Sequence, residues 1–377
     1  MAGRTDLITT GADADSAGGG LAGRAGPKTR SRKDGAAVPL DDVDRRLLNL
    51  MQGSFPIAPR PYLHVAELGG LSEAEAMSRV ERLLEKRIIR QVTPIFDTRA
   101  LGYSSMLVAA KVDPEHPHRA ASVINEHPGV SHNYLRNHEF NLWFTIATEP
   151  DSELGLQGTL EVLAHQAGAE SVRQLPTLKL FKIRMDLEME GDTQALASAA
   201  AAADPIELEP QPYDELDIAV IRALQGDMPV VAEPYQRAAA AVGLSEERFL
   251  EHLAGMQDRG LLRRVAAILY HRRAGFSANG MGVWQVPDAQ IFDIGCRMAA
   301  FRGISHCYQR PTYEDWPYSV FTMAHGRSKE ECDAVLDAIA EQTGIHERAT
   351  LYSSTEFKKI RLLYFTEDFK NWETQHA

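Results

Sequence analysis

Two short stretches of this 377-residue chain carry the same three polar residues at alternate positions. They are SHNYLR (131–136) and SHCYQR (305–310), and the shared residues are His132, Tyr134, Arg136, His306, Tyr308 and Arg310. Alternate side chains of a β-strand point to one face of its sheet, so each trio shares a face. Arginine binds carboxylates or phosphates through a forked pair of donors, histidine donates a proton or binds a metal, and tyrosine adds a flat ring with a hydroxyl. We therefore predict a ligand-binding face in each stretch.

Further polar and aromatic residues follow both stretches closely. They are Asn137, His138 and Trp143 after the first stretch, and Tyr313, Trp316 and Tyr318 after the second. Aromatic rings beside arginine and histidine suit a large, flat, anionic ligand. Arg90 and Arg263 are either additional anion-binding residues or ordinary cations near the end of a helix. His271 is another candidate ligand or acid, although Thr98 stands at its position in the first half of the chain.

The two stretches belong to two copies of one longer unit. LDDVD (40–44) recurs as YDELD (213–217), 173 residues further on. The His-Tyr-Arg stretches are 174 residues apart, whereas FT (144–145) and FT (321–322) are 177 apart, which places three extra residues of the second copy within 311–317. Collinear matches over this length indicate an internal duplication of about 150 residues per copy.

Each copy is predicted to fold into the same two parts. The first part has three helices, which suggests a helix-turn-helix; Asp41 precedes the first helix, and Ser72 with Glu75 predicts a capping box at the third. The second part alternates strand, helix, strand, strand, helix, strand, which is the ferredoxin-like βαββαβ order. In the first copy these elements are expected at 105–112, 115–127, 130–136, 140–148, 152–167 and 171–187.

The predicted fold class is therefore α+β, a tandem duplication in which a helix-turn-helix domain precedes a ferredoxin-like domain. The first residues and an alanine-rich segment between the copies lack apolar periodicity, which indicates a disordered tail and a linker. The expected boundaries are 1–39 for the tail, 40–95 and 96–188 for the first pair of domains, 189–212 for the linker, and 213–268 and 269–377 for the second pair.

The helices of a ferredoxin-like sheet cover one face and leave the other open. The smaller or less charged residues of each stretch are expected to face the helices; they are Ser131, Asn133, Leu135, Ser305, Cys307 and Gln309. The two His-Tyr-Arg faces are then expected to line a cavity where the two sheets face one another.

The composition disfavours several classes of protein. Lys and Arg number 40 against 52 Asp and Glu, a net charge of −12, which argues against a nucleic-acid partner. No apolar stretch is long enough to span a membrane, and no secretory signal is apparent. The 3 cysteines form no CxxC pair, so neither a zinc site nor a disulfide framework is indicated. We expect a cytoplasmic protein that contacts no membrane.

The order of a helix-turn-helix followed by βαββαβ resembles the Lrp/AsnC family of transcription regulators. A DNA-reading helix needs cationic or hydrogen-bonding side chains in its first turns. This chain has Glu73 and Glu75 there in the first copy, and Glu246 and Glu247 in the second. Carboxylates at these positions repel phosphates but suit the helix dipole. We therefore expect no nucleic-acid partner.

Longer motifs resemble another family that shares this fold, the siroheme decarboxylases. SHNYLRNHEFNLWFT (131–145) looks like the hallmark of one class of their subunits, and SHCYQRPTYEDWPYSVFTMAHG (305–326) with ANGMGVW (278–284) looks like that of the partner class. QGSFPIAPRPY (52–62) is also typical. The resemblance covers 40–369 and joins both classes in one chain, as in the fused NirD–NirL type.

The resemblance implies a carboxy-lyase that removes CO2 from the acetate side chains at C12 and C18 of siroheme, giving 12,18-didecarboxysiroheme. Fusion favours the haem d1 route over the alternative siroheme-dependent haem route. The family needs no cofactor of its own, because the iron enters with the substrate. The candidates for a ligand of that iron are His132, His138, His271 and His306. One chain already supplies a pseudo-dimer, and a homodimer or companion decarboxylase subunits are further candidate assemblies.

The residues divide into roles on this basis. A cation on the reacting carboxylate would stabilise the ground state, so the arginines are expected to hold the non-reacting carboxylates. The proposed proton donors are His132, His306 and Tyr308, and the proposed substrate-binding residues are Arg136, Arg310, Arg90, Arg263, Tyr134, Asn137, His138, Trp143, His271, Tyr313, Trp316 and Tyr318. The alternatives are a siroheme- or haem-binding carrier or sensor that releases no CO2, and an Lrp/AsnC-like transcription regulator.

Overall fold

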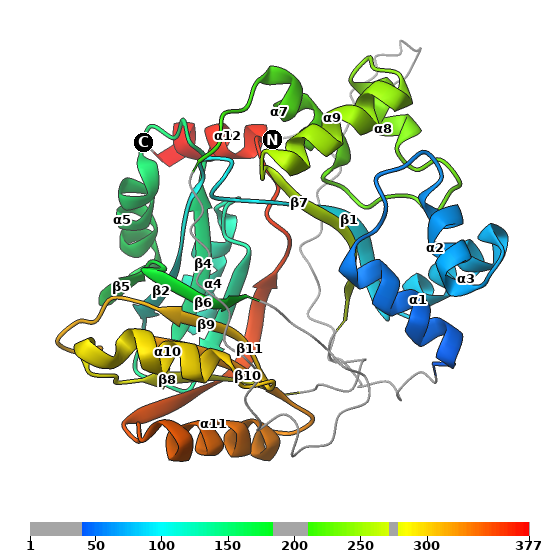
Figure 1. The fold of residues 1–377 in the computed structure, drawn as a ribbon. Coiled ribbons are helices and arrows are strands. Elements are labelled where there is room, and N and C mark those ends of the chain that lie inside the picture. Colours follow the sequence, from blue (N-terminus) through cyan, green and yellow to red (C-terminus); the bar gives the residue numbers. More distant parts are fainter. Residues whose placement is uncertain (1–39, 184–209, 271–277, 377) are drawn as a thin grey trace, which may run out of the picture. The chain divides into compact units, whose positions relative to one another are not determined.

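Each copy begins with three helices in the computed structural model, which describes residues 40–183, 210–270 and 278–376 (Figure 1). The helices are α1 (Asp42–Gly53), α2 (Pro61–Gly69) and α3 (Glu73–Glu85), followed in the second copy by α7 (Glu215–Leu224), α8 (Gln236–Ala241) and α9 (Glu246–Asp258). Side chains cap their first turns: Ser72 accepts a hydrogen bond from the Glu75 N–H, and Asp214 and Asp217 form a reciprocal capping box. None of the described helices is long and apolar enough to cross a membrane.

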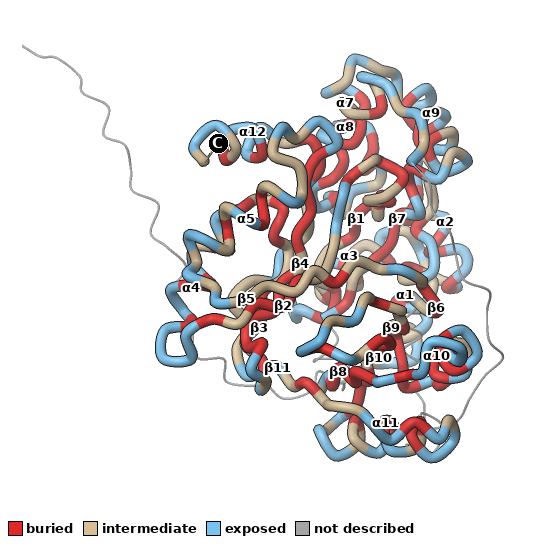
Figure 2. Tube along the Cα trace, turned by 90° about the vertical axis from the view of Figure 1, so that its left-hand side faces the viewer, coloured by how far each residue is buried: buried red, intermediate tan, exposed pale blue. Residues whose placement is uncertain are grey.

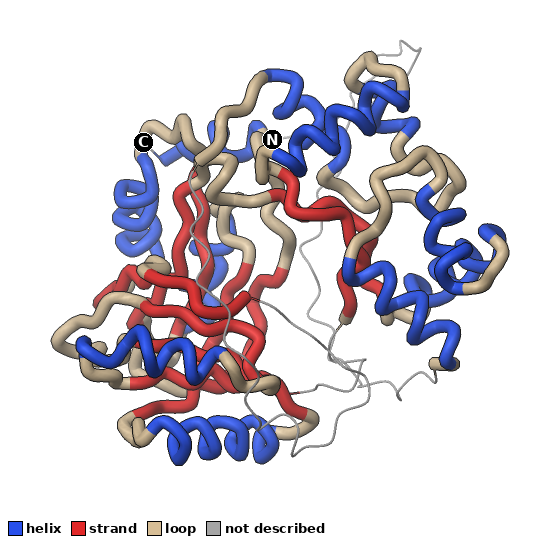
Figure 3. Tube along the Cα trace, viewed as in Figure 1, coloured by secondary structure: helices blue, strands red, loops and turns tan. Residues whose placement is uncertain are grey.

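A two-stranded ribbon that the sequence reading did not anticipate joins the two sets of helices. Strand β1 (Ile89–Phe96) pairs antiparallel with β7 (Leu262–Leu269), with Thr93 opposite Ala266. Figure 3 shows this pair apart from the larger sheet. One apolar core runs through the ribbon and the helices of both copies, and its buried members include Leu47, Val80, Val220, Phe249 and Val265.

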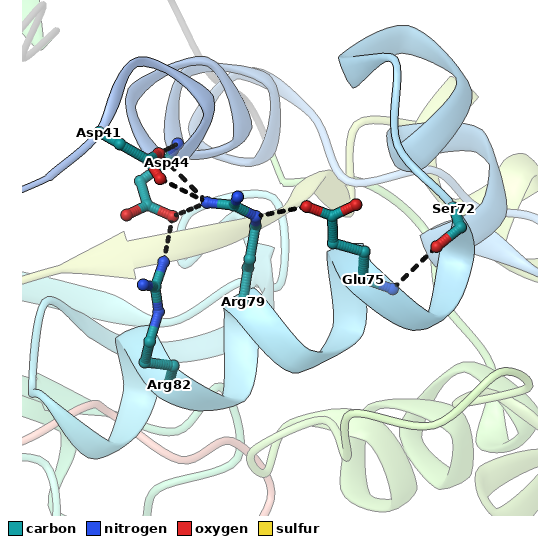
Figure 4. A network of polar contacts seen from close by, with 6 residues as sticks. All are labelled: Asp41, Asp44, Ser72, Glu75, Arg79 and Arg82. Carbon is teal, nitrogen blue, oxygen red and sulfur yellow. Dashed lines mark hydrogen bonds and ion pairs between the residues drawn. The ribbon is translucent and has the colours of Figure 1, made fainter.

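A buried aspartate ties the first helix to the third in each copy. Arg79 of α3 donates to Asp41 and Asp44 at 2.8 and 2.9 Å, and Arg82 also donates to Asp44 (Figure 4). In the second copy Asp217 accepts two hydrogen bonds from Arg259, at 2.7 and 2.8 Å, and lies 2.8 Å from His252 Nε2. In each copy, arginines on or just after the third helix therefore form ion pairs within the domain.

The remaining strands form one nine-stranded antiparallel sheet. Its order is β5-β2-β4-β3-β11-β8-β10-β9-β6. The strands are β2 (Ser104–Lys111), β3 (His132–Arg136), β4 (Leu142–Thr148), β5 (Ser171–Leu175), β6 (Lys179–Ile183), β8 (Ala278–Trp284), β9 (Ile304–Gln309), β10 (Val320–Gly326) and β11 (Arg348–Lys359). The predicted α+β duplication with βαββαβ halves is thereby confirmed, but the expectation of two separate facing sheets is wrong.

The two halves are fused because each sends a strand into the other. The first part of β11 pairs with β8 of its own copy and the second part with β3 of the first copy. Conversely, β6 of the first copy pairs with β9 of the second. The strand predicted at 171–187 is broken into β5 and β6 at Pro176, which has no N–H to donate. Because β5 and β6 form opposite edges of the sheet yet are three residues apart, the sheet curls until its edges approach.

Helices cover the outer face of this curled sheet. Two come from each copy: α4 (Pro117–Glu126), α5 (Gly155–Ala167), α10 (Ile291–Ala299) and α11 (Lys329–Thr343). A short 3₁₀ helix η2 (Asp288–Gln290) precedes α10, and α12 (Glu367–His376) packs Trp372 against the core under α4 and α5. Figure 2 shows the buried residues concentrated in the strands, whereas α10 and α11 keep an exposed side.

The strand register corrects the predicted insertion. Trp143 lies opposite Tyr134, and Phe321 lies opposite Tyr308. The connections between the paired strands are residues 137–140 in the first copy and 311–318 in the second, so the second has four extra residues rather than three. The matching FT dipeptides misled the alignment by one position. Because a shift of one residue exchanges the faces of a strand, Phe144 points to the helices whereas Phe321 points inward.

We expect Asp217→Asn to lower the free energy of unfolding by about 2 kcal/mol. This is less than the ~3–5 kcal/mol of a fully buried pair, because the Arg259 side chain is 37% exposed and can be rehydrated. Burial raises the pKa of Asp217, but the hydrogen bonds from Arg259 and from the Asp214 N–H outweigh it and leave the pKa lowered. The stabilisation is therefore present above the ordinary carboxyl pKa of about 4 and is lost as the pH falls through the folded-state pKa.

Urea unfolding followed by circular dichroism at neutral pH and at about pH 3 measures this difference. Glu251→Gln, which neutralises an exposed carboxylate on α9, the helix that carries His252, is the control. Equal stability of Asp217→Asn and the wild type at neutral pH would contradict the role of the buried pair.

Candidate active site

A cavity of about 590 Å³ lies within the curled sheet and receives both His-Tyr-Arg faces. All six residues line it: His132, Tyr134, Arg136, His306, Tyr308 and Arg310. Two of the intervening residues, Asn133 and Cys307, contact the covering helices as expected, whereas Ser131 is among the residues that line the cavity. Asn133 donates to Asn125 of α4 at 3.0 Å, and Cys307 Sγ lies 3.6 Å from the Gly295 carbonyl of α10. The alternation of each strand thus presents its chemically active face to the cavity.

The two arginines are held in matching ways by the opposite copy. Arg136 Nη1 donates to the Leu351 carbonyl at 2.9 Å, and Arg310 Nη1 donates to the Leu175 carbonyl. Each guanidinium also lies beside a tyrosine ring, with 5.8 Å from Arg136 to Tyr134 and 4.8 Å from Arg310 to Tyr308. Burial lowers the pKa of both arginines to about 10, so both remain charged at neutral pH.

Part of each guanidinium has no partner. The buried Nε atoms of Arg136 and Arg310 make no hydrogen bond with any described residue. A buried donor without an acceptor costs free energy, and it costs more when the group is charged. These atoms therefore favour an acceptor, ideally an anion, inside the cavity.

Two further cations line the cavity that the sequence did not single out. They are Arg99, in the turn after β1, and Lys359, at the end of β11. No Asp or Glu is found among the described lining residues. No local motif marks Arg99 or Lys359, because the tertiary fold brings both to the cavity from distant parts of the sequence. They are recognised in the structure as cations in a cavity whose described lining residues include no acids.

The other two predicted arginines lie outside the lining. Arg263 forms an ion pair with buried Asp97 at 2.6 Å, which offsets part of its charge. Arg90 also lies outside the lining, but its charge contributes to lowering the pKa of His132. Both therefore act on the cavity through their electric field rather than as part of its wall.

His132 is held as a neutral imidazole. Its Nδ1 atom lies 3.0 Å from Ser131 Oγ and 3.5 Å from Thr145 Oγ1. Burial lowers its pKa to about 4, and the charges of Lys359 and Arg90 lower it further in the same direction. In the second copy His306 Nδ1 lies 2.6 Å from Ser305 Oγ, and burial raises the pKa of Tyr308.

The aromatic residues of the insertion fill space rather than line the cavity. Trp316 is fully buried and packs on Trp143, with ring centroids 5.3 Å apart. The Tyr313 hydroxyl donates to the Gln174 carbonyl at 2.5 Å. With Tyr318 and Phe140 these rings form an apolar cluster that adjoins the cavity through Trp143, which belongs to both.

The remaining predicted residues lie as follows. Asn137 accepts a hydrogen bond from the Tyr352 N–H at 2.8 Å, and His138 packs edge-on against Trp316 at 5.1 Å, so neither lines the cavity. His271 lies outside the described residues. Two residues that sequence reasoning missed, Asn279 and His325, line the cavity in the second copy. Asn279 lies in the ANGMGVW segment and His325 in the MAHG segment, and membership of these family-typical segments could have pointed to both residues.

The cavity therefore combines arginines, a lysine, histidines and aromatic faces in one curled sheet. This arrangement suits a flat, polyanionic ligand. Together with the duplicated helix-turn-helix, it defines the class of Lrp/AsnC-like ligand-binding proteins. The family model "AsnC-like ligand binding domain" matches residues 100–182 and 273–358, and "Siroheme decarboxylase NirDL-like HTH domain" matches 44–90 and 217–263.

Close relatives narrow this class to one family. The chain is 38% identical over 328 residues to the siroheme decarboxylase of Hydrogenobacter thermophilus, covering 87% of this chain and 96% of the relative. The crystal structure of the siroheme decarboxylase NirDL matches with a TM-score of 0.72 at 33% identity, covering 89% of this chain and 98% of that one. NirDL in complex with an iron-uroporphyrin III analogue matches with a TM-score of 0.70 at 32% identity, with the same coverage. The chain belongs to the siroheme decarboxylase family.

We expect the His132 imidazole to remain neutral between about pH 5.5 and 8 in the substrate-free protein, since its pKa of about 4 lies below this range. Lys359→Gln removes a nearby positive charge and should raise the pKa of His132, because the protonated form is then repelled less. Titration of the imidazole by NMR measures both effects. Lys111→Gln, whose ammonium faces Glu139 and Glu170 instead, is the control. A His132 pKa near 6.5 in the wild type would contradict this prediction.

Proposed function

We propose that this protein is a siroheme decarboxylase that removes CO2 from the acetate side chains at C12 and C18 of siroheme, giving 12,18-didecarboxysiroheme for haem d1 synthesis. The observation that carries the proposal is the cavity that holds Arg99, Arg136, Arg310 and Lys359 with no acid among its described lining residues. Siroheme is flat and bears eight carboxylates, so it meets both requirements of the cavity. The solved relative with an iron-uroporphyrin III analogue supports the same class of ligand.

The cations and the aromatic rings position the substrate in this proposal. Nη1 of Arg136 and of Arg310 donates to a backbone carbonyl, and the remaining N–H groups of both arginines hold non-reacting carboxylates of the substrate. Arg99 and Lys359 hold further non-reacting carboxylates. Tyr134, Trp143 and their counterparts offer flat faces to the macrocycle. Arg90 and Arg263 add positive potential from outside the cavity wall.

The chemical step requires a place for electrons and a proton. When CO2 leaves, the bonding pair flows toward the macrocycle, and the new methyl carbon takes a proton. A positioned general acid contributes roughly 10²–10⁴-fold to such a step. His132, His306 and Tyr308 line the cavity and are the proposed donors. The macrocycle and its iron enter as substrate, and we propose no resident cofactor.

The helix-turn-helix domains serve as structural supports in this proposal. Arg79 and Arg82 of α3 are bonded to Asp41, Asp44 and Glu75, so they are not available to phosphates (Figure 4). The first turns of α3 and α9 are acidic. These contacts favour a protein that does not use DNA as a partner. Both copies of the chain build the one cavity, which supports a pseudo-dimer as the working unit.

Anaerobic incubation of the purified chain with siroheme tests the function. We expect the mass of the tetrapyrrole to fall by that of two CO2 molecules, and NMR of the product to show methyl groups at C12 and C18. Binding with unchanged mass would make the protein a carrier or sensor and would contradict the proposal. Loss of CO2 from other side chains would contradict the assigned positions.

Histidine variants test the proposed acids. We expect His306→Ala to lower the rate of CO2 loss by roughly 10²-fold or more, because protonation then relies on water. His132→Ala is measured beside it, and His165→Ala, an exposed residue at the end of α5, is the control. Full turnover in both His132→Ala and His306→Ala would eliminate the histidines as proton donors.

A further inference from the structure

Four polar residues of the second copy form a hydrogen-bonded chain, and three of them, His306, His325 and Asn279, line the cavity. His306 Nδ1 lies 2.6 Å from Ser305 Oγ, and Ser305 Oγ lies 2.5 Å from His325 Nε2. His325 Nδ1 lies 2.8 Å from Asn279 Oδ1, directly across strands β8 and β10. Ser305 and His325 are buried, whereas Asn279 is exposed.

The first copy has no such chain at the equivalent positions. The cross-strand pair that corresponds to Asn279 and His325 consists of Ser105 and Ala147. The Nδ1 atom of His132 instead lies near two hydroxyls, those of Ser131 and Thr145. The first copy therefore lacks a second imidazole behind its cavity histidine at this position, although it retains the serine.

The acceptor at the outer end gives the chain a direction. An amide oxygen only accepts hydrogen bonds, so His325 Nδ1 must donate to Asn279 Oδ1. A neutral His325 then accepts the Ser305 hydroxyl proton at Nε2, and Ser305 accepts from His306 Nδ1. With one extra proton on the chain, every bond inward of Asn279 reverses. His325 Nε2–H then donates to Ser305, Ser305 donates to His306 Nδ1, and His306 carries its own proton on Nε2.

We propose that Asn279, His325 and Ser305 form a proton relay that makes His306, rather than His132, the principal acid of the decarboxylation. This inference rests on the proposed function and adds an asymmetry between the copies. His325 stores the proton two hydrogen bonds away from His306. His306 acts directly on the substrate, while Ser305, His325 and Asn279 are positioning residues, of which His325 and Asn279 also line the cavity.

The proton balance of one step needs no reactant other than water. The acetate C–C bond breaks, CO2 leaves, and the bonding pair becomes available at the new methyl carbon through the macrocycle. His306 Nε2 gives its proton to that carbon. The Ser305 proton moves to His306 Nδ1, and the His325 Nε2 proton moves to Ser305. These hydrogen-bonded residues are then neutral, and they take up one proton from water before the next step.

Three variants of the full chain test the relay with siroheme under anaerobic conditions. His325→Gln keeps a hydrogen-bonding side chain but cannot store a proton, and we expect kcat to fall roughly 10–100-fold with KM within about threefold. Asn279→Leu removes the acceptor and should also lower kcat, whereas Asn279→Asp keeps an acceptor and should restore turnover. Ser305→Ala should lower kcat more than Ser131→Ala, its counterpart in the first copy.

Two results would overturn the relay. One is wild-type turnover in His325→Gln and Ser305→Ala. The other is a change confined to KM, which would indicate only a packing role. If the wild type releases no CO2, the proposed function fails by itself, and ¹⁵N spectra of the imidazoles still test the relay. In the neutral protein His306 and His325 should each carry the proton on Nδ1, and Ser305→Ala should abolish that preference in His306. Protons on Nε2 of both rings would contradict the chain.

Discussion

The exchange of strands between the two copies is the constraint on which the cavity depends. In a separate copy, β3 or β9 would lie at a sheet edge, with unpaired backbone groups beside its histidine, tyrosine and arginine. In the protein, β11 pairs with β3 and β6 pairs with β9. Both strands that carry a His-Tyr-Arg face, β3 and β9, therefore become internal. The same exchange places the Leu351 carbonyl at Arg136 and the Leu175 carbonyl at Arg310. Each half of the molecule therefore orients the arginine of the other half to which we assign a substrate carboxylate.

The electrostatics of the cavity follow from this closure. Removing arginines from water is costly when no carboxylate accompanies them, and the lowered pKa values of Arg136 and Arg310 express that cost. Backbone carbonyls and aromatic faces offset part of it. A ligand with many carboxylates offsets more, because it brings the missing negative charge. The net charge of −12 is thus compatible with an anionic substrate, since several cations are gathered along the cavity.

The two copies share the His-Tyr-Arg face but differ in the residues next to it. The His-Tyr-Arg face is repeated, and so is the serine next to each histidine. The imidazole and amide behind the serine occur in the second copy, where Ala147 and Ser105 stand in the first. The helix-turn-helix domains diverge less in their packing, since a buried aspartate holds the third helix in each. In the proposed function, this fold supports the cavity rather than binding DNA.

The sequence by itself determined the features that depend on local order. The duplication, the α+β class and the shared face of His132, Tyr134 and Arg136 follow from collinear matches and from the two-residue period of a strand. The six cavity residues of the His-Tyr-Arg faces could be predicted for this reason. The family resemblance also rested on contiguous motifs, which can be recognised in the sequence without knowledge of the fold.

The tertiary structure alone decided the features that depend on pairing between distant segments. Strand exchange and the ribbon of β1 and β7 depend on which distant strands pair. The length of the insertion depends on strand register, and the matching FT dipeptides shifted its alignment by one position. Arg99 and Lys359 reach the cavity from turns and strand ends that carry no motif, while Trp316, a plausible ligand contact in sequence, is buried in an apolar cluster. A sequence states which side chains a strand presents, but the surroundings of those side chains are set by segments far along the chain.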